Sequence, residues 1–135
     1  MVTARQLSER KGRRAEIITI WLYRVMGWRL MKYRTKTPFG EIDIVMQKKM
    51  RLKFIEVKYR SFRPLKKFYA EMETILPSAT QQKRLKRSIH YFSEKFIENS
   101  NVNNNLFSVE SDIILWNGWF YFDIQKDVME TETAF

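Results

Sequence analysis

The chain has 135 residues, the size of one domain, and its 44% of hydrophobic residues argues against general disorder. It contains no cysteine, which excludes a disulfide framework, a thiolate metal site and a cysteine nucleophile, and fits a reducing compartment. The net charge of +10, from 25 Lys and Arg against 15 Asp and Glu, favours a polyanionic partner. Nucleic acid ranks ahead of a merely solvated basic surface.

The N-terminal part predicts a helix from about Ser8 to Met26, ended by Gly27. Its apolar residues recur at helical spacing rather than continuously, and no small-residue cleavage site follows them. We therefore expect neither a secretory signal nor a membrane partner, and the protein is predicted to be cytoplasmic. The apolar stripe consists of Ile17, Ile18, Trp21, Leu22, Val25 and Met26.

Three strands are expected next. Residues 28–34 have the pattern of a short strand, and residues 38–40 that of a turn. Residues 41–46 and 51–60 both alternate in character, so they predict an antiparallel ribbon joined by a short hairpin connection. On its first strand, one face should carry Ile42, Ile44 and Met46, and the other Glu41, Asp43 and Val45.

The second half of the chain predicts another long helix. A looser helical pattern lies first between Pro64 and Pro77. Ser78 and Gln81 then match a capping box, and the helix that follows should run to about Glu98. Its apolar stripe consists of Leu85, Ile89, Phe92 and Phe96.

The last predicted elements are two strands after an Asn-rich surface loop at residues 99–105. They cover residues 107–116 and 119–124, and the Asn-Gly pair between them is a strong signal for a hairpin. The order α-β-β-β-α-β-β predicts an α/β or α+β fold, with a mixed central sheet flanked by helices. We expect one domain over residues 1–135, with its core at about 9–124 and a short tail at 125–135.

The ribbon carries three charged residues that suggest a chemistry. Glu56 and Lys58 are two apart on a strand, so both side chains leave the same face, and Asp43 on the other strand can add a second carboxylate. Adjacent carboxylates repel each other, and a hard cation such as Mg²⁺ or Mn²⁺ relieves that repulsion. An adjacent ammonium can orient a metal-activated water or stabilise charge on a phosphate. The set suits metal-assisted phosphodiester hydrolysis, although a cross-strand salt bridge of Lys58 with either acid would also account for it.

Four segments of the chain stand out together: KGRRAE with Gly12, Ala15 and Glu16, GEIDIV at 40–45, FIEVKYR at 54–60, and Lys83-Arg84-Leu85. In these segments the chain resembles the YraN family of small bacterial proteins. The family belongs to the PD-(D/E)xK nuclease-like superfamily, alongside archaeal Holliday-junction resolvases. The resemblance extends over residues 9–124 and implies a restriction-endonuclease-like core.

The resemblance also implies roles for individual residues. Asp43 and Glu56 would bind the metal, and Lys58 would be the catalytic lysine. Glu16 would be an additional acid near the metal, whereas helical periodicity alone places it away from the apolar stripe, as a solvated residue.

Four further residues are predicted to bind nucleic acid. Gln81 and Lys83 lie at the start of the second helix, whose N-terminus favours an anion, and Arg84 belongs to the same basic run. Arg60 follows the ExK segment. The competing interpretation is a capping glutamine on a solvated basic helix.

The chain departs from the family at two places. Residues 61–80 lack the glycine that the family usually has before its conserved lysine. Residues 110–113 are Glu-Ser-Asp-Ile where the family usually has Arg-Phe-Asp-Val, so the arginine is lost. Both changes lie outside the triad of Asp43, Glu56 and Lys58, and concern substrate contacts more than metal binding.

We therefore expect a Mg²⁺-dependent or Mn²⁺-dependent endonuclease or resolvase-like phosphodiesterase that acts on nucleic acid, in the first place DNA. The alternative is a non-catalytic nucleic-acid-binding protein that retains the nuclease fold. A protein-interaction domain with incidental charge is a third interpretation. Resolvase-like relatives act as dimers, so the resemblance also allows a homodimer.

Overall fold

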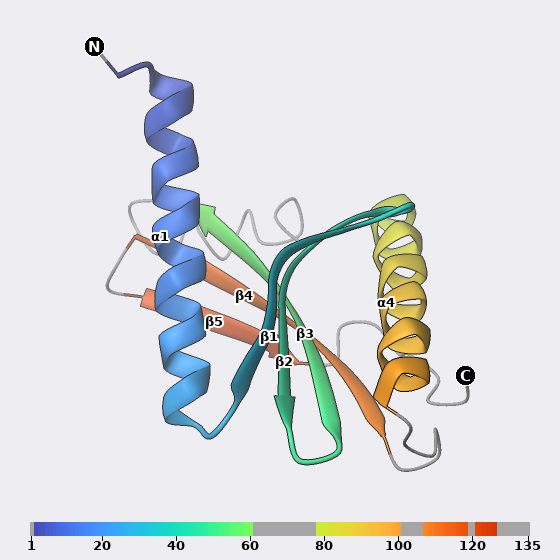
Figure 1. The fold of residues 1–135 in the computed structure, drawn as a ribbon. Coiled ribbons are helices and arrows are strands. Elements are labelled where there is room, and N and C mark those ends of the chain that lie inside the picture. Colours follow the sequence, from blue (N-terminus) through green and yellow to red (C-terminus); the bar gives the residue numbers. More distant parts are fainter. Residues whose placement is uncertain (1, 61–77, 101–106, 119–120, 127–135) are drawn as a thin grey trace.

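The computed structural model describes residues 2–60, 78–100, 107–118 and 121–126. A five-stranded mixed sheet lies between two long helices, one on each face (Figure 1). The elements are α1 (Ala4–Val25), β1 (Arg29–Thr37), β2 (Gly40–Lys48), β3 (Arg51–Arg60), α4 (Ala79–Ser100), β4 (Ser108–Asn117) and β5 (Tyr121–Lys126). The predicted order and the mixed α+β class are confirmed. The helical pattern between Pro64 and Pro77, most of the Asn-rich loop and the end of the tail lie outside the described residues.

The sheet has the strand order β1-β2-β3-β4-β5, and all neighbouring strands are antiparallel except β3 and β4. Parallel neighbours need a long crossover connection, and α4 lies within the one that joins β3 to β4. The predicted ribbon and C-terminal hairpin are confirmed as the β2–β3 and β4–β5 pairs. β1 is longer than predicted and continues to Thr37.

The β1–β2 hairpin extends past its contact with β3 and reaches α4 (Figure 1). Pairing of β2 with β3 ends at Ile44 and Ile55, whereas β1 and β2 stay paired as far as Thr37. There the Thr37 hydroxyl donates to the hydroxyl of Ser88 on α4 at 2.9 Å. The two central strands therefore separate at Asp43.

This separation makes one prediction about β2 wrong. Ile44 and Met46 pack in the core cluster under α1, but Ile42 packs in the cluster under α4 together with Val45. Strict alternation would place Ile42 on the same face as Ile44. Because the hairpin tip turns toward α4, the alternation is broken next to Asp43.

α1 begins earlier than predicted. A capping box between Thr3 and Gln6 starts the helix at Ala4. Gly27, with a φ of 94°, follows its C-terminal end as expected. Within the described ranges, no helix combines the length and hydrophobicity that crossing a membrane requires.

The face that α1 buries is not the apolar stripe seen in the sequence. Trp21 keeps 60% and Val25 86% of their accessible surface, and of that stripe only Leu22 packs against the core. The buried face includes Thr19, whose hydroxyl donates to the carbonyl of Ala15 and accepts from the Trp116 indole. The prediction chose the buried face of the helix by the hydrophobicity of its residues. It therefore missed a buried face whose polar groups are hydrogen-bonded inside the core. The residues of that face are Ala15, Glu16, Thr19, Ile20 and Tyr23.

α4 agrees with its prediction. The amide oxygen of Gln81 accepts from the Ser78 N–H at 3.0 Å, and the Ser78 hydroxyl accepts from the Gln81 N–H at 3.3 Å, which completes the capping box. On the sheet side Ile89 is buried, and the ring of Phe92 meets that of Phe54 edge to face at 5.8 Å between centroids. These contacts fix the middle of α4 over the sheet.

A buried ion pair lies under α1. Lys53 on β3 is only 6% exposed, and its ammonium lies 3.0 Å from the carboxylate of Asp112 on β4. Asp112 also accepts from the Tyr23 hydroxyl at 2.8 Å, and burial followed by the Asp112 charge raises the pKa of Tyr23. The Lys53 ammonium lies 4.6 Å from the centroid of the Trp28 ring. Lys53 on the neighbouring strand β3 therefore neutralises Asp112. Position 110 of β4, where the family usually has an arginine, carries a glutamate.

Candidate active site

Asp43 lies where β2 and β3 separate. Beyond the last pair, Ile44 with Ile55, its Oδ2 atom accepts a hydrogen bond from the Val57 N–H at 3.0 Å. The carboxylate therefore satisfies a β3 donor that a regular ladder would give to a carbonyl of β2. This contact holds Asp43 against β3, beside Glu56.

Asp43 and Glu56 form a close pair of partly buried acids. The pKa of Glu56 is raised from its ordinary 4.5 to about 8, first by burial and then by the charge of Asp43. The pKa of Asp43 is raised as well, mainly by burial, while the hydrogen bond from Val57 opposes that rise. The charge of Lys58 lowers both pKa values, so its ammonium acts on both acids. The pair resists double ionisation unless a cation joins it.

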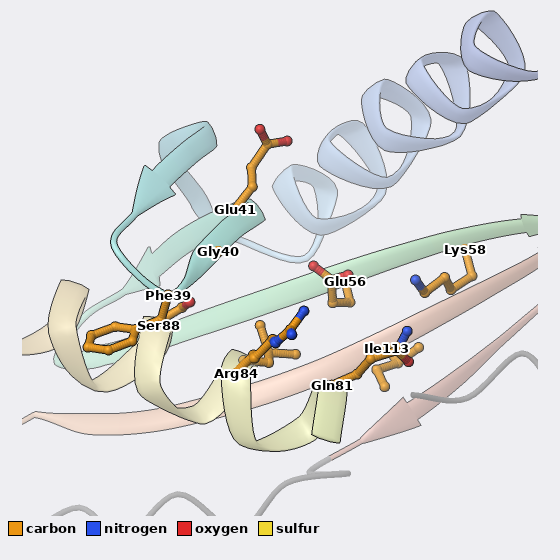
Figure 2. A pocket seen from close by; sticks show the side chains of 10 residues that line it. Phe39, Gly40, Glu41, Glu56, Lys58, Gln81, Arg84, Ser88 and Ile113 are labelled. Carbon is orange, nitrogen blue, oxygen red and sulfur yellow. The ribbon is translucent and has the colours of Figure 1, made fainter. Parts of the chain in front are cut away.

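Glu56 and Lys58 line a pocket of about 230 Å³ between β3 and α4. Figure 2 shows the Lys58 ammonium and the Arg84 guanidinium directed toward the Glu56 carboxylate. Gln81 from the first turns of α4 and Phe39 from the hairpin tip line the same pocket. The pocket thus combines a carboxylate with two cations and an amide. A carboxylate can bind a phosphate through a metal ion, and the cations and the amide can bind it directly.

The four residues predicted to bind nucleic acid occupy different places. Gln81 and Arg84 line the pocket, and Gln81 uses only its amide oxygen in the helix cap. Lys83 is exposed and does not line the pocket. Arg60 donates from Nη1 to the carbonyl of Tyr59 at 2.8 Å, at the end of β3. The structure therefore brings two of the four to the pocket of Glu56.

Glu16 is buried, contrary to the position that helical periodicity gives it. It is 7% exposed, and it accepts hydrogen bonds from the Tyr33 hydroxyl at 2.6 Å and from Arg34 Nε and Nη2 at 2.9 and 3.1 Å. The hydrogen bond to Glu16 raises the pKa of Arg34. The charge of Glu16 also raises the pKa of Asp43, so α1 places a third acid near the pair. In this structure the Glu16 carboxylate is hydrogen-bonded to Tyr33 and Arg34 of β1.

Sequence reasoning missed Arg34, which binds Glu16. Tyr33 and Arg34 are consecutive on β1 and would point to opposite faces of a regular strand, yet both reach Glu16. The explanation is the backbone of Arg34, whose φ of 52° lies in the left-handed region. Residues other than glycine adopt it rarely, and the local sequence gave no signal for it.

The acid pair fits a hard divalent cation. In the part of the chain that the structure describes, no three His, Cys, Asp or Glu side chains are grouped so that they could hold a metal. Asp43 and Glu56 would supply two carboxylates, which is the usual protein contribution to Mg²⁺, whereas zinc sites take three or four protein ligands. Asp43 and Glu56 thus suit Mg²⁺ or Mn²⁺, with water and substrate oxygens as the other ligands.

Fold and site together define a mixed α+β protein with two partly buried acids and a lysine where two central strands separate. The profile of the uncharacterised protein family UPF0102 matches residues 15–123 of the chain. The chain belongs to this family, which is the YraN family that its motifs resemble.

Individual relatives match shorter parts of the chain. It is 43% identical to the UPF0102 protein of Sphingopyxis alaskensis over 56 residues, which cover 42% of this chain and 48% of the relative. For the UPF0102 protein of Erythrobacter litoralis the identity is 45% over 60 residues, covering 44% and 51%. For that of Parvibaculum lavamentivorans it is 40% over 79 residues, covering 58% and 54%. The chain thus spans about half the length of the curated relatives it matches.

Proposed function

We propose that this protein is a Mg²⁺-dependent or Mn²⁺-dependent phosphodiesterase that cuts nucleic acid, in the first place DNA, as an endonuclease or resolvase. The observation that carries the proposal is the pair of partly buried carboxylates, Asp43 and Glu56, of which Glu56 lines a pocket together with Lys58 and Arg84. The resemblance to PD-(D/E)xK nucleases supports it, because the two acids and the lysine are the residues that match that motif.

Each group would have a separate task. A divalent cation bound by Asp43 and Glu56 would supply an activated water and neutralise charge on the phosphate. The Lys58 ammonium would orient that water or stabilise the negative charge that develops on the phosphate. The Arg84 guanidinium would bind a phosphate oxygen, helped by the nearby N-terminus of α4.

The same two acids make a purely binding role the weaker alternative. Without a cation, Asp43 and Glu56 would repel a phosphate that docks in the pocket. Their partial burial also costs free energy, which a binding protein could avoid with neutral residues. The net charge of +10 supports catalysis and binding equally. The acids therefore favour turnover.

A cleavage assay with single variants tests this proposal. The purified full chain is mixed with Mg²⁺ or Mn²⁺ and with duplex, single-stranded or four-way-junction DNA. We expect cleavage by the wild type, and a loss of at least about 100-fold in Lys58→Ala and Asp43→Asn, because each removes a group that acts on the reacting phosphate. Lys11→Ala on α1 removes one positive charge away from the pocket and should cut normally.

Two results would contradict the proposal. Cleavage that survives Asp43→Asn would show a contaminating nuclease or a different site. Salt-sensitive DNA binding without cleavage on any substrate or metal would instead favour the non-catalytic alternative.

A further inference from the structure

A second groove continues from the candidate active site along α4. Phe39, at the turn between β1 and β2, lines both the pocket of Glu56 and this groove, whose volume is about 510 Å³. The two cavities therefore share one aromatic side chain as their boundary. The other lining residues of the groove all belong to α4: Lys86, Arg87, His90, Tyr91 and Glu94.

The position of Phe39 is fixed although its ring remains 42% exposed. Its N–H donates to the Thr37 hydroxyl at 3.2 Å, and that hydroxyl donates to Ser88 on α4. The Phe39 ring also meets the ring of Tyr91 edge to face, at 6.4 Å between centroids. The hairpin tip thus presents an ordered aromatic surface to solvent, directly between the two cavities.

The groove also has the charge that a nucleic-acid strand requires. Lys86 and Arg87 are exposed, and among the described residues neither is in an ion pair. Arg84 in the pocket and Arg87 in the groove are about 4.5 Å apart along the axis of α4. Residues three apart on a helix lie on the same face, so both cations can follow one strand along α4. A strand with its reacting phosphate at Glu56 would therefore place the next phosphates near these cations.

We propose that the groove binds an unpaired nucleotide next to the reacting phosphate, with its base stacked on Phe39. The preferred substrate is then DNA that is single-stranded or splayed at the cleavage point. A base within a continuous duplex has both faces covered by its neighbours, whereas an unpaired base can stack on an aromatic ring. This proposal names the substrate class of the proposed function and rests on it for the position of the reacting phosphate.

Binding measurements without cleavage test the groove. A short single-stranded oligonucleotide containing 2-aminopurine is titrated in Mg²⁺ with the full chain carrying Lys58→Ala, which should keep the metal ligands without cutting, and fluorescence reports both binding and stacking. Phe39→Ala should weaken binding about 5- to 100-fold and remove the quenching of 2-aminopurine. Phe39→Trp should restore both, because it keeps an aromatic face. Binding to the matching duplex should change by less than about twofold.

Trp21→Ala is the matched control, because it removes an aromatic ring that is 60% exposed on α1, away from both cavities. It should leave binding and quenching unchanged. The groove assignment is wrong if Phe39→Ala binds the single strand like the wild type, or loses single strand and duplex equally. If cleavage depends on Asp43 but Phe39→Ala does not change binding or quenching, only the groove assignment is wrong. Phe39-dependent stacking without any cleavage would overturn the proposed function alone.

Discussion

Replacing Lys53 by alanine should lower the free energy of unfolding by about 3 to 5 kcal/mol, because it leaves a buried carboxylate without its cation. Asp112 is 2% exposed and lies 3.0 Å from the Lys53 ammonium. The Tyr23 hydroxyl would still donate to Asp112, but a neutral donor does not balance a charge inside the core. Urea unfolding followed by tryptophan fluorescence at neutral pH measures the change.

Arg51→Ala is the matched control for this loss. Arg51 lies on the same strand, two residues before Lys53, and pairs with Glu110 on the same neighbouring strand at 2.7 Å. Its side chain is 45% exposed, so its removal should cost about 1 kcal/mol or less. The double variant Lys53→Met with Asp112→Asn should recover most of the stability, because no charge remains buried. Equal losses of stability in Lys53→Ala and Arg51→Ala would show that Lys53 is not needed to neutralise the buried carboxylate of Asp112.

Replacing Glu56 by glutamine should stabilise the metal-free protein by on the order of 2 kcal/mol at pH 8. The pKa of Glu56 in the folded state is about 8, well above its ordinary 4.5. The folded state therefore binds more protons than the unfolded state between these values, so the stability of the wild type falls as pH rises from about 4.5 to about 8. Glutamine removes the charge that burial and Asp43 oppose. At pH 5 the gain should nearly vanish.

The control for this effect is Glu41→Gln. Glu41 lines the same pocket as Glu56, but its side chain is exposed and points away from Glu56 (Figure 2). This variant should change the free energy of unfolding by less than about 0.5 kcal/mol at either pH. Unfolding curves from pH 5 to pH 8 give both comparisons. A Glu56→Gln variant that is less stable than the wild type at pH 8 would contradict the repulsion between the two acids.

The elements that the sequence predicts well are those specified by local patterns. The Ser78 and Gln81 capping box, the stripe on α4 and the Asn-Gly hairpin each depend on residues only a few positions apart. The pairing of Asp43 with Glu56 follows from the same kind of pattern, because a short hairpin connection sets the register of two adjacent strands. Family membership also follows from these short motifs.

The features that the sequence did not predict depend on tertiary packing. The buried face of α1 contains Thr19 and Glu16, whose hydrogen bonds come from β4 and β1 rather than from neighbouring residues. The left-handed backbone of Arg34 is stabilised by its contacts with Glu16 on another element. The turn of the hairpin tip toward α4 moves Ile42 to the other core and places Phe39 at the pocket. None of these contacts has a signal in the residues around it.

The central claim is that Asp43 and Glu56 together bind a divalent cation, and Mn²⁺ binding measured by electron paramagnetic resonance tests it most directly. The wild type should bind about one Mn²⁺ per chain, and Mg²⁺ should compete for the same site. Asp43→Asn and Glu56→Gln should each abolish this binding, while Glu98→Gln, at an exposed acid of α4 that lines neither cavity, should retain it. Mn²⁺ that binds equally well to Asp43→Asn, or does not bind the wild type at all, would contradict the assignment of this site.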